Sequence, residues 1–294
     1  MANLKAIRIR ITSFKSTRQI TSAMKMVSAA KLRKAQDKIV RLRPYANKLH
    51  ELLIDLSISL SESEVENVYG RVSPPENVLI IVITSNRGLC GAFNTNVINE
   101  TRRVISEKYA DQLRKGNLKL MTIGKKGFDY FKRQKVNMLP EQNNLYNELT
   151  FENVSRVAEG LMISFELLEF DRVEFIYNQF KNAAVQNLTN EVFLPVETIP
   201  SGVNKTTPAD YIYEPDKEEI IQELIPKSLK IQFYKAVLDS FVAEHGARMT
   251  AMHKATDNAT DLIRDLTLQY NKARQAAITN QILEVVSGAE ALRG

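Results

Sequence analysis

Hydrophobic residues in the first sixty positions recur at the spacing of a coiled coil. Residues 1–69 contain no glycine and one proline, Pro44, so the segment can form one continuous helix. Its apolar residues alternate at steps of four and three, which is the heptad pattern of paired helices. These seam positions are Leu4, Ile7, Ile11 and Phe14, followed by Ala35, Ile39, Leu42, Ala46, Leu49, Leu53, Leu56 and Leu60.

The two parts of this seam are separated by a stretch with a different rhythm. Ile20, Met24 and Val27 do not continue the phase of the apolar residues on either side. We expect the apolar stripe to slip there. Pro44 removes one helical hydrogen bond further along, so the sequence predicts an irregular, bent helix.

The C-terminal part of the chain repeats the pattern. Ten of its twelve heptad positions are apolar, and Gly246 is a local defect that costs about 1 kcal/mol relative to alanine. His245, at a seam position, is expected to be a packed histidine and not a ligand. The twelve positions are Leu238, Val242, His245, Met249, Met252, Thr256, Ala259, Ile263, Leu266, Tyr270, Ala273 and Ala277.

The middle of the chain changes from a helical period to alternating strands and helices. This alternation predicts a small, Rossmann-like open α/β domain. Strands are expected at residues 78–84, 118–123, 173–180 and 191–196. Helices are expected from the turn at residues 85–91 to Ala110, at 125–134 and at 151–168.

The predicted order of elements gives three regions and an antiparallel pair. Residues 1–69 form the first helix, 70–207 the central α/β domain, with a surface loop near 201–208, and 208–294 the second helix. Because the chain leaves one helix, builds a domain and returns into the other, the two helices most simply run antiparallel. The fold class is therefore α/β with a long antiparallel coiled coil.

Charge is concentrated at one end. The chain carries a net charge of +6, but residues 1–50 hold thirteen Lys or Arg and one acidic residue, while the remainder is net negative. A basic helix of this kind can bind nucleic acid, an anionic membrane surface or an acidic protein. It lacks aromatic residues between Phe14 and Tyr45 for stacking on single strands. A cleavable, Arg-rich presequence also fits its composition.

The residues offer no clear catalytic or metal chemistry. One cysteine and three histidines supply no zinc spacing and no internal disulfide. The turn at residues 85–91 holds Gly88 and Gly91 but matches neither a P-loop nor a dinucleotide fingerprint, so a structural turn is favoured over nucleotide binding. Cys90 is expected to be a small buried residue. No apolar run is long enough to cross a membrane, and no cofactor is predicted.

Four motifs extend this picture by resemblance. They are ITSFKSTRQITSAMKMV at 11–27 with AKLRKAQ at 30–36, RGLCG at 87–91, ARMTAM and ATDNA at 247–259, and YNKARQAAIT at 270–279. In this order they resemble the gamma subunit of F-type ATP synthases over nearly the whole chain. The resemblance implies a non-catalytic rotor stalk that couples proton-driven rotation of the c-ring to ATP synthesis or hydrolysis.

The resemblance also implies partners. The shaft would stand inside a hexamer of three alpha and three beta subunits, and the foot would contact the epsilon subunit and the c-ring. No nucleic acid or membrane insertion is implied. The match begins within the first eleven residues, which favours a bacterial protein without a presequence, at the cytoplasmic face of the plasma membrane. The single cysteine excludes the regulatory dithiol of plastid relatives.

Seven residues correspond to partner contacts of that family. Met24 matches a methionine at the level of an acidic beta-subunit loop, and Arg248 matches an arginine implicated in coupling. Arg274 and Gln275, with Thr279 nearby, match residues that a catch loop of beta contacts. Tyr213 and Glu214 match the foot segment that faces the c-ring and epsilon.

One position departs from the family. Many relatives carry a carboxylate near Gln281, so a contact that needs a charge there is not expected in this chain.

Two alternatives come from other classes of protein. A coiled-coil scaffold or nucleic-acid-binding stalk would bind its partner alone, with a steep dependence on salt. A small α/β nucleotide enzyme with helical arms would bind or hydrolyse ATP unaided.

Overall fold

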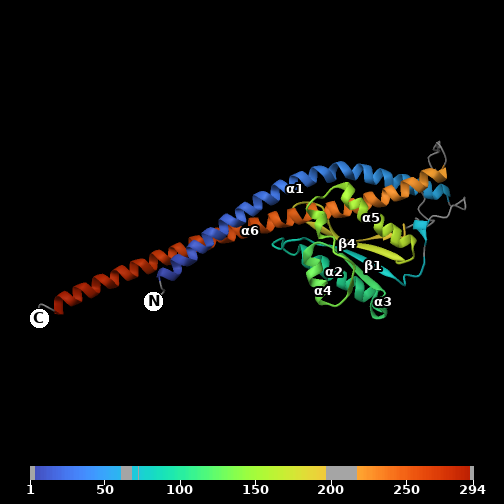
Figure 1. The fold of residues 1–294 in the computed structure, drawn as a ribbon. Helices are drawn as coiled ribbons and strands as arrows, with labels where there is room; N and C mark the ends of the chain where they lie inside the picture. Colours follow the sequence, from blue (N-terminus) through green and yellow to red (C-terminus); the bar gives the residue numbers. More distant parts are fainter. Residues whose placement is uncertain (1–3, 61–67, 72, 197–216, 292–294) are drawn as a thin grey trace. The chain divides into compact units, whose positions relative to one another are not determined.

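A long helix stands at each end of the chain. The computed structural model describes residues 4–60, 68–71, 73–196 and 217–291. Helix α1 spans Leu4–Leu60 and helix α6 spans Lys217–Ala291 (Figure 1). Contacts divide the chain into two units: unit 1 is Met1–Ser28 with Arg248–Gly294, and unit 2 is Ala29–Ala247.

In unit 2 the predicted seam is apolar and buried. Ala35, Ile39 and Leu49 of α1 are at most 5% exposed, and Leu238 and Val242 of α6 are at most 1% exposed. His245 is also buried and its ring packs edge-on against Phe241, with centroids 4.5 Å apart. The heptad prediction and the packed-histidine prediction are confirmed here.

In unit 1 a hydrogen bond fixes how the helices pair. The hydroxyls of Thr21 and Thr256 lie 2.8 Å apart. If the helices run antiparallel, each residue toward the N-terminus of α1 lies opposite a residue the same distance toward the C-terminus of α6. This register places Ile11 opposite Leu266 and Ile7 opposite Tyr270. Ile7 and Leu266 are buried as this register requires. The antiparallel prediction is confirmed.

The predicted phase slip in α1 is wrong. Thr21 and Ser28 are buried at 9% and 3% exposure, whereas Ile20 and Val27 are about 60% exposed. The seam keeps its steps of three and four from Phe14 through 18, 21, 25 and 28 to Leu32. Polar residues occupy the seam in this stretch, so the apolar residues nearby mark the outer face and not a shifted stripe.

The central domain contains a mixed five-stranded sheet. The strand order is β3-β2-β1-β4-β5, with β4 and β5 antiparallel and the other pairs parallel. The strands are β1 Val78–Ile83, β2 Leu118–Ile123, β3 Asn137–Met138, β4 Arg172–Phe180 and β5 Gln186–Leu194. The helices between them are α2 Phe93–Lys108, α3 Ala110–Lys115, α4 Lys125–Arg133 and α5 Phe151–Glu166, with short 3-10 turns at Val68–Gly70 and Asn143–Tyr146.

These elements confirm the predicted α/β domain, with three local differences. The helix expected to reach Ala110 ends at Lys108, because Tyr109 adopts φ −125° before α3 begins. The fourth predicted strand begins earlier, at Gln186, because a tight turn at residues 182–185 folds it back against β4. Strand β3 has only two residues and no periodic signal.

Both faces of the sheet are covered. Val78, Ile80 and Val82 pack in a cluster with Val97 and Val104 of α2. On the other face Phe175 and Phe193 pack against Phe233 of α6, with ring centroids 4.8 to 5.8 Å apart. Within unit 2, α6 therefore lies between the sheet and α1 (Figure 1).

Gly246 has a packing role beyond the local defect that the sequence suggested. A Cβ atom there would lie 3.2 Å from the Cα of Ala183, in the turn between β4 and β5. The missing side chain thus allows the backbone of α6 to approach this turn closely.

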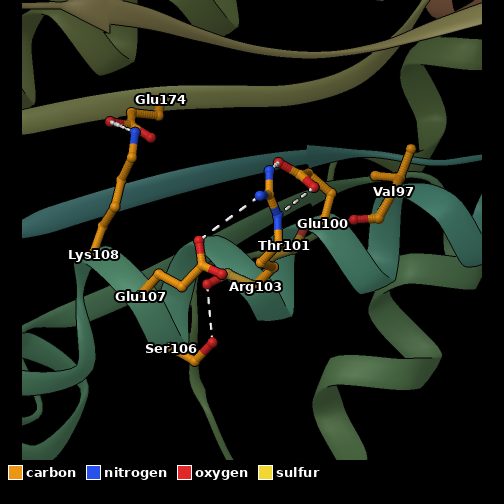
Figure 2. Close-up of polar contacts among 8 residues, drawn as sticks. All are labelled: Val97, Glu100, Thr101, Arg103, Ser106, Glu107, Lys108 and Glu174. Atoms are coloured by element: carbon orange, nitrogen blue, oxygen red, sulfur yellow. Dashed lines mark hydrogen bonds and ion pairs between the residues drawn. The ribbon is translucent and has the colours of Figure 1, made fainter.

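A buried carboxylate anchors α2 and the following residue to the sheet. Glu174 of β4 is 1% exposed and accepts hydrogen bonds from Tyr109 Oη at 2.6 Å and Arg172 Nε at 2.8 Å. Burial alone would raise the pKa of Glu174, but these bonds and the charge of Lys108 hold it below its ordinary value. Figure 2 shows Lys108 reaching Glu174, and Arg103 between Glu100 and Glu107 on the outer face of α2.

Candidate interaction surface

The far end of α6 presents a bare helix. Every residue from 278 to 291 is exposed, and the register of unit 1 shows why. Ala273 pairs with Leu4, so residues further along α6 have no counterpart in the described part of α1. Ile278, Ile282 and Val285 are 47 to 72% exposed.

Three predicted contact residues lie at the start of this bare segment. Arg274, Gln275 and Thr279 are all exposed. The Thr279 hydroxyl donates a hydrogen bond to the Gln275 carbonyl at 3.0 Å, because residues four apart share a helix face. Gln275 and Thr279 therefore share one helix face, and Arg274 precedes Gln275 in the sequence; these three exposed residues are called the polar patch of α6. Gln281 is also exposed and leaves this segment without a carboxylate before Glu284.

The other two predicted shaft residues are partly or largely buried. Met24 of α1 is half-buried and directly precedes the seam position at residue 25. Arg248 of α6 is only 6% exposed and makes contacts within the protein. Tyr213 and Glu214 lie outside the described residues.

The two helices of unit 1 carry different charge. Residues 4–28 of α1 contain six Lys or Arg and no acidic residue, whereas residues 248–291 of α6 contain five of each sign. Arg8, Arg10 and Lys15 are exposed. Because the charges of α6 cancel, the pair has one strongly basic side and one nearly neutral side.

Sequence reasoning missed an apolar surface on α1. Ile9, Ile20, Met26 and Val27 are each 58 to 62% exposed. Met26 also lines a shallow groove of about 340 Å³ between the helices. The other lining residues are Arg18, Gln19, Ser22, Ala23 and Thr256. The signal was present in the sequence: carrying the heptad strictly through residues 14 to 32 places Ile20 and Val27 outside.

Asparagine side chains hold the glycine-bearing turn after β1. The Ser85 N–H donates to Asn94 Oδ1 of α2 at 2.9 Å, and Asn86 Oδ1 accepts from the Lys125 N–H, at the start of α4, at 3.0 Å. These bonds tie the turn to the first residues of both helices. Cys90 is 1% exposed, so the prediction of a small buried residue is confirmed.

No described helix combines the length and hydrophobicity needed to span a bilayer. Among the same residues, no three His, Cys, Asp or Glu side chains gather as a metal site would require.

The architecture defines a class of protein. Two terminal helices paired antiparallel, with a mixed α/β domain inserted between them in the sequence, make a coiled-coil stalk protein. The sequence profile of the ATP synthase family, described as "ATP synthase", matches residues 3–292.

Relatives narrow this class to one chain type. The ATP synthase gamma chains of Flavobacterium psychrophilum and Flavobacterium johnsoniae are 56% and 57% identical, over the full length of both chains in each comparison. A chain of the Euglena gracilis mitochondrial ATP synthase, from a structure of its OSCP, F1 and c-ring, matches with a TM-score of 0.70 at 23% identity. It covers 98% of this chain and 94% of its own length. The protein belongs to the ATP synthase gamma chain family.

Proposed function

We propose that this chain is the central rotor stalk of an F-type ATP synthase. The observation that carries the proposal is the match to ATP synthase gamma chains over the full length of both sequences. The antiparallel pairing of α1 and α6 supports it, because a shaft must resist twisting over its whole length. A free scaffold or nucleic-acid-binding stalk is not favoured, since neither alternative accounts for this match.

The chain itself contributes no catalytic site. ATP chemistry belongs to the three beta subunits, which alternate with three alpha subunits around the shaft. The glycine-bearing turn at residues 85–91 supports this division, because it matches neither a P-loop nor a dinucleotide fingerprint. No cofactor is needed for a mechanical role.

Rotation is coupled to nucleotide binding by differential contact. The c-ring, driven by protons, turns the foot of the stalk, and the shaft turns with it. Because unit 1 has a basic side on α1 and a nearly neutral side on α6, each beta subunit meets a different surface at any moment. A surface that binds one conformation of a partner better than another shifts the partner's population toward it.

Specific contacts follow from the family resemblance and the exposed surfaces. The basic face of α1 faces an acidic loop of beta near Met24 and Arg248. The patch formed by Arg274, Gln275 and Thr279 meets the catch loop of beta. Tyr213 and Glu214 face the epsilon subunit and the c-ring. The chain sits at the cytoplasmic face of the bacterial plasma membrane, held there by its partners and not by insertion.

Co-expression with the alpha and beta subunits of the same organism tests the proposal. The purified complex should contain one copy of this chain per three of each partner, and its ATPase activity should depend on the chain. With the remaining subunits in vesicles, the complex should pump protons when ATP is added. A chain that purifies alone and binds nucleic acid or hydrolyses ATP unaided would contradict it.

A charge placed at Met24 tests the contact with beta. In Met24→Lys an added ammonium lies beside the acidic loop of beta and forms an ion pair with it. Each rotation step must then break this ion pair, at a cost of about 1 kcal/mol if the pair is exposed and more if it is desolvated. ATP-driven pumping should fall relative to hydrolysis. Met24→Leu keeps the volume without the charge and should pump normally. Equal pumping by both variants would remove Met24 from the contact.

A further inference from the structure

In unit 2, side-chain contacts join helices α1 and α6 to the α/β domain. A load applied to the α/β domain can pass to the helices through the side-chain contacts of the described residues.

Helix α6 has many such contacts. Phe233 packs against two phenylalanines of the sheet, and the Gln232 amide donates to Glu191 Oε1 at 2.7 Å and to the Val192 carbonyl at 3.3 Å. The backbone at Gly246 lies against Ala183. These contacts hold α6 to both strands of the β4–β5 hairpin.

An arginine of helix α1 reaches the same hairpin. Arg43 Nη2 donates to the Phe180 carbonyl, at the end of β4, and to Asp239 Oδ1 of α6, both at 2.8 Å. The two hydrogens of one planar nitrogen point in fixed directions. Arg43 can therefore make both bonds only when α1, α6 and β4 are held in one arrangement.

The contacts of Arg43 with Asp239 and Phe180 fix the arrangement of these elements more than they add to the stability of the fold. The Asp239 side chain is fully buried, and the Arg43 side chain is 37% exposed. Burial raises the pKa of Asp239, and the guanidinium of Arg43 counteracts that rise. A buried ion pair commonly adds no stability over a well-packed apolar pair. Two apolar residues would hold the helices together equally well, but they would leave Phe180 without this bond.

We propose that Arg43 is a positioning residue for rotation, which locks α1, α6 and the end of β4 so that a load on the α/β domain turns both helices together. The inference rests on the proposed rotor function and adds a residue to which the family resemblance gave no role. Arg43 touches no nucleotide and acts only through the elements that it holds.

Three variants separate positioning from charge balance. Arg43→Met removes both bonds and leaves the Asp239 carboxylate buried. Arg43→Met combined with Asp239→Leu replaces the ion pair by an apolar pair but still lacks the bond to Phe180. Arg41→Met is the matched control, because Arg41 is an exposed arginine on the same helix.

The measurement is the ratio of ATP-driven proton pumping to ATP hydrolysis in the reconstituted complex, with the thermal midpoint of the purified chain beside it. Arg43→Met should lower the midpoint and reduce the ratio at least threefold. The double variant should recover the midpoint within a few degrees while its ratio stays low. Arg41→Met should match the wild type in both.

Two results would overturn the proposal. One is an unchanged ratio in Arg43→Met. The other is a double variant that recovers both midpoint and ratio, since Arg43 would then only balance the charge of Asp239. If Arg43→Met does not assemble, Arg43→Lys keeps the charge without the planar fork, and its ratio should still fall; a wild-type ratio there also overturns the proposal. A wild-type complex that fails to pump would instead refute the rotor function itself.

Discussion

The two units bury polar groups in different ways. Unit 2 buries full charges, Glu174 and Asp239, and gives each a cationic partner at 2.8 Å. Unit 1 buries the charged Arg248 at its first residue of α6, but along its helix seam α1 buries hydroxyls, at Thr21 and Ser28, and Thr21 is bonded to Thr256 of α6.

The two kinds of buried polar group specify the structure of each unit in different ways. A buried charge that loses its partner is strongly penalised, so the pairs of unit 2 favour one arrangement of strands and helices. A hydroxyl in a coiled-coil seam specifies register at a smaller cost in stability. Each Thr hydroxyl has one hydrogen, and both lie near backbone carbonyls of their own helix. Only one of them can therefore donate across the seam at a time.

The largest expected effect is in the apolar seam of unit 2. Ile39→Ala removes a fully buried side chain and should destabilise the chain by about 3 kcal/mol, because it creates a cavity between packed helices. Val40→Ala, at a neighbouring exposed position, should cost under about 0.5 kcal/mol. Urea denaturation followed by helical circular dichroism measures both. Equal effects would mean that α1 and α6 do not pack at Ile39.

A somewhat smaller effect concerns the buried charge of Glu174. Tyr109→Phe removes a hydrogen bond to this carboxylate and should cost about 2 kcal/mol at neutral pH. Glu174 has a lowered pKa in the folded state, so its stabilisation is present above its ordinary pKa of 4.5 and is lost as the pH falls through the folded value. The difference between variant and wild type should therefore shrink below about pH 4.5. A difference that stays constant from pH 7 to pH 4 would contradict this assignment.

The hydroxyl seam of unit 1 should respond more weakly. Thr21→Val leaves Thr256 with its own backbone acceptor, so the cost should be at most about 1 kcal/mol. Thr21→Val combined with Thr256→Val removes both hydroxyls and should be neutral or slightly stabilising, because two methyl groups then meet in the seam. Denaturation of the single and double variants tests this. Additive losses would contradict this expectation, because each hydroxyl would then stabilise the seam independently of the other.

The smallest effect on stability belongs to the exposed patch of α6. Arg274→Ala with Gln275→Ala should change the unfolding free energy by less than about 0.5 kcal/mol, since both side chains are exposed. The same variant should weaken assembly or torque transfer in the reconstituted complex. A double variant at exposed positions that are not in the patch, Asn271→Ala with Lys272→Ala, serves as control. Normal hydrolysis and pumping in the first variant would exclude the patch as a contact.

The sequence predicted the elements with strong periodicity and missed those that tertiary contacts define. The seam of α6, the apolar parts of the α1 seam and strand β2 followed directly from apolar spacing. Strand β3 has two residues and exists only because β2 offers a parallel edge, which no local pattern reports.

The surface was harder to predict than the core. Arg274, Gln275 and Thr279 came from family resemblance and proved exposed, whereas Ile20 and Val27 were misassigned because their hydrophobicity outweighed the strict heptad count. Arg43 and Asp239 carry no local signal, since they are 196 residues apart in the sequence. Such a pair emerges only when the fold brings the two helices together.

Rotation of this chain inside its complex tests the central claim most directly. Cys90 is buried, so Ser106→Cys on the exposed face of α2 offers a selective site for a probe. With the alpha and beta subunits immobilised and ATP supplied, the probe should turn in one direction and pause three times per turn, once for each beta subunit. ATP hydrolysis by the complex while the probe remains stationary would contradict the account.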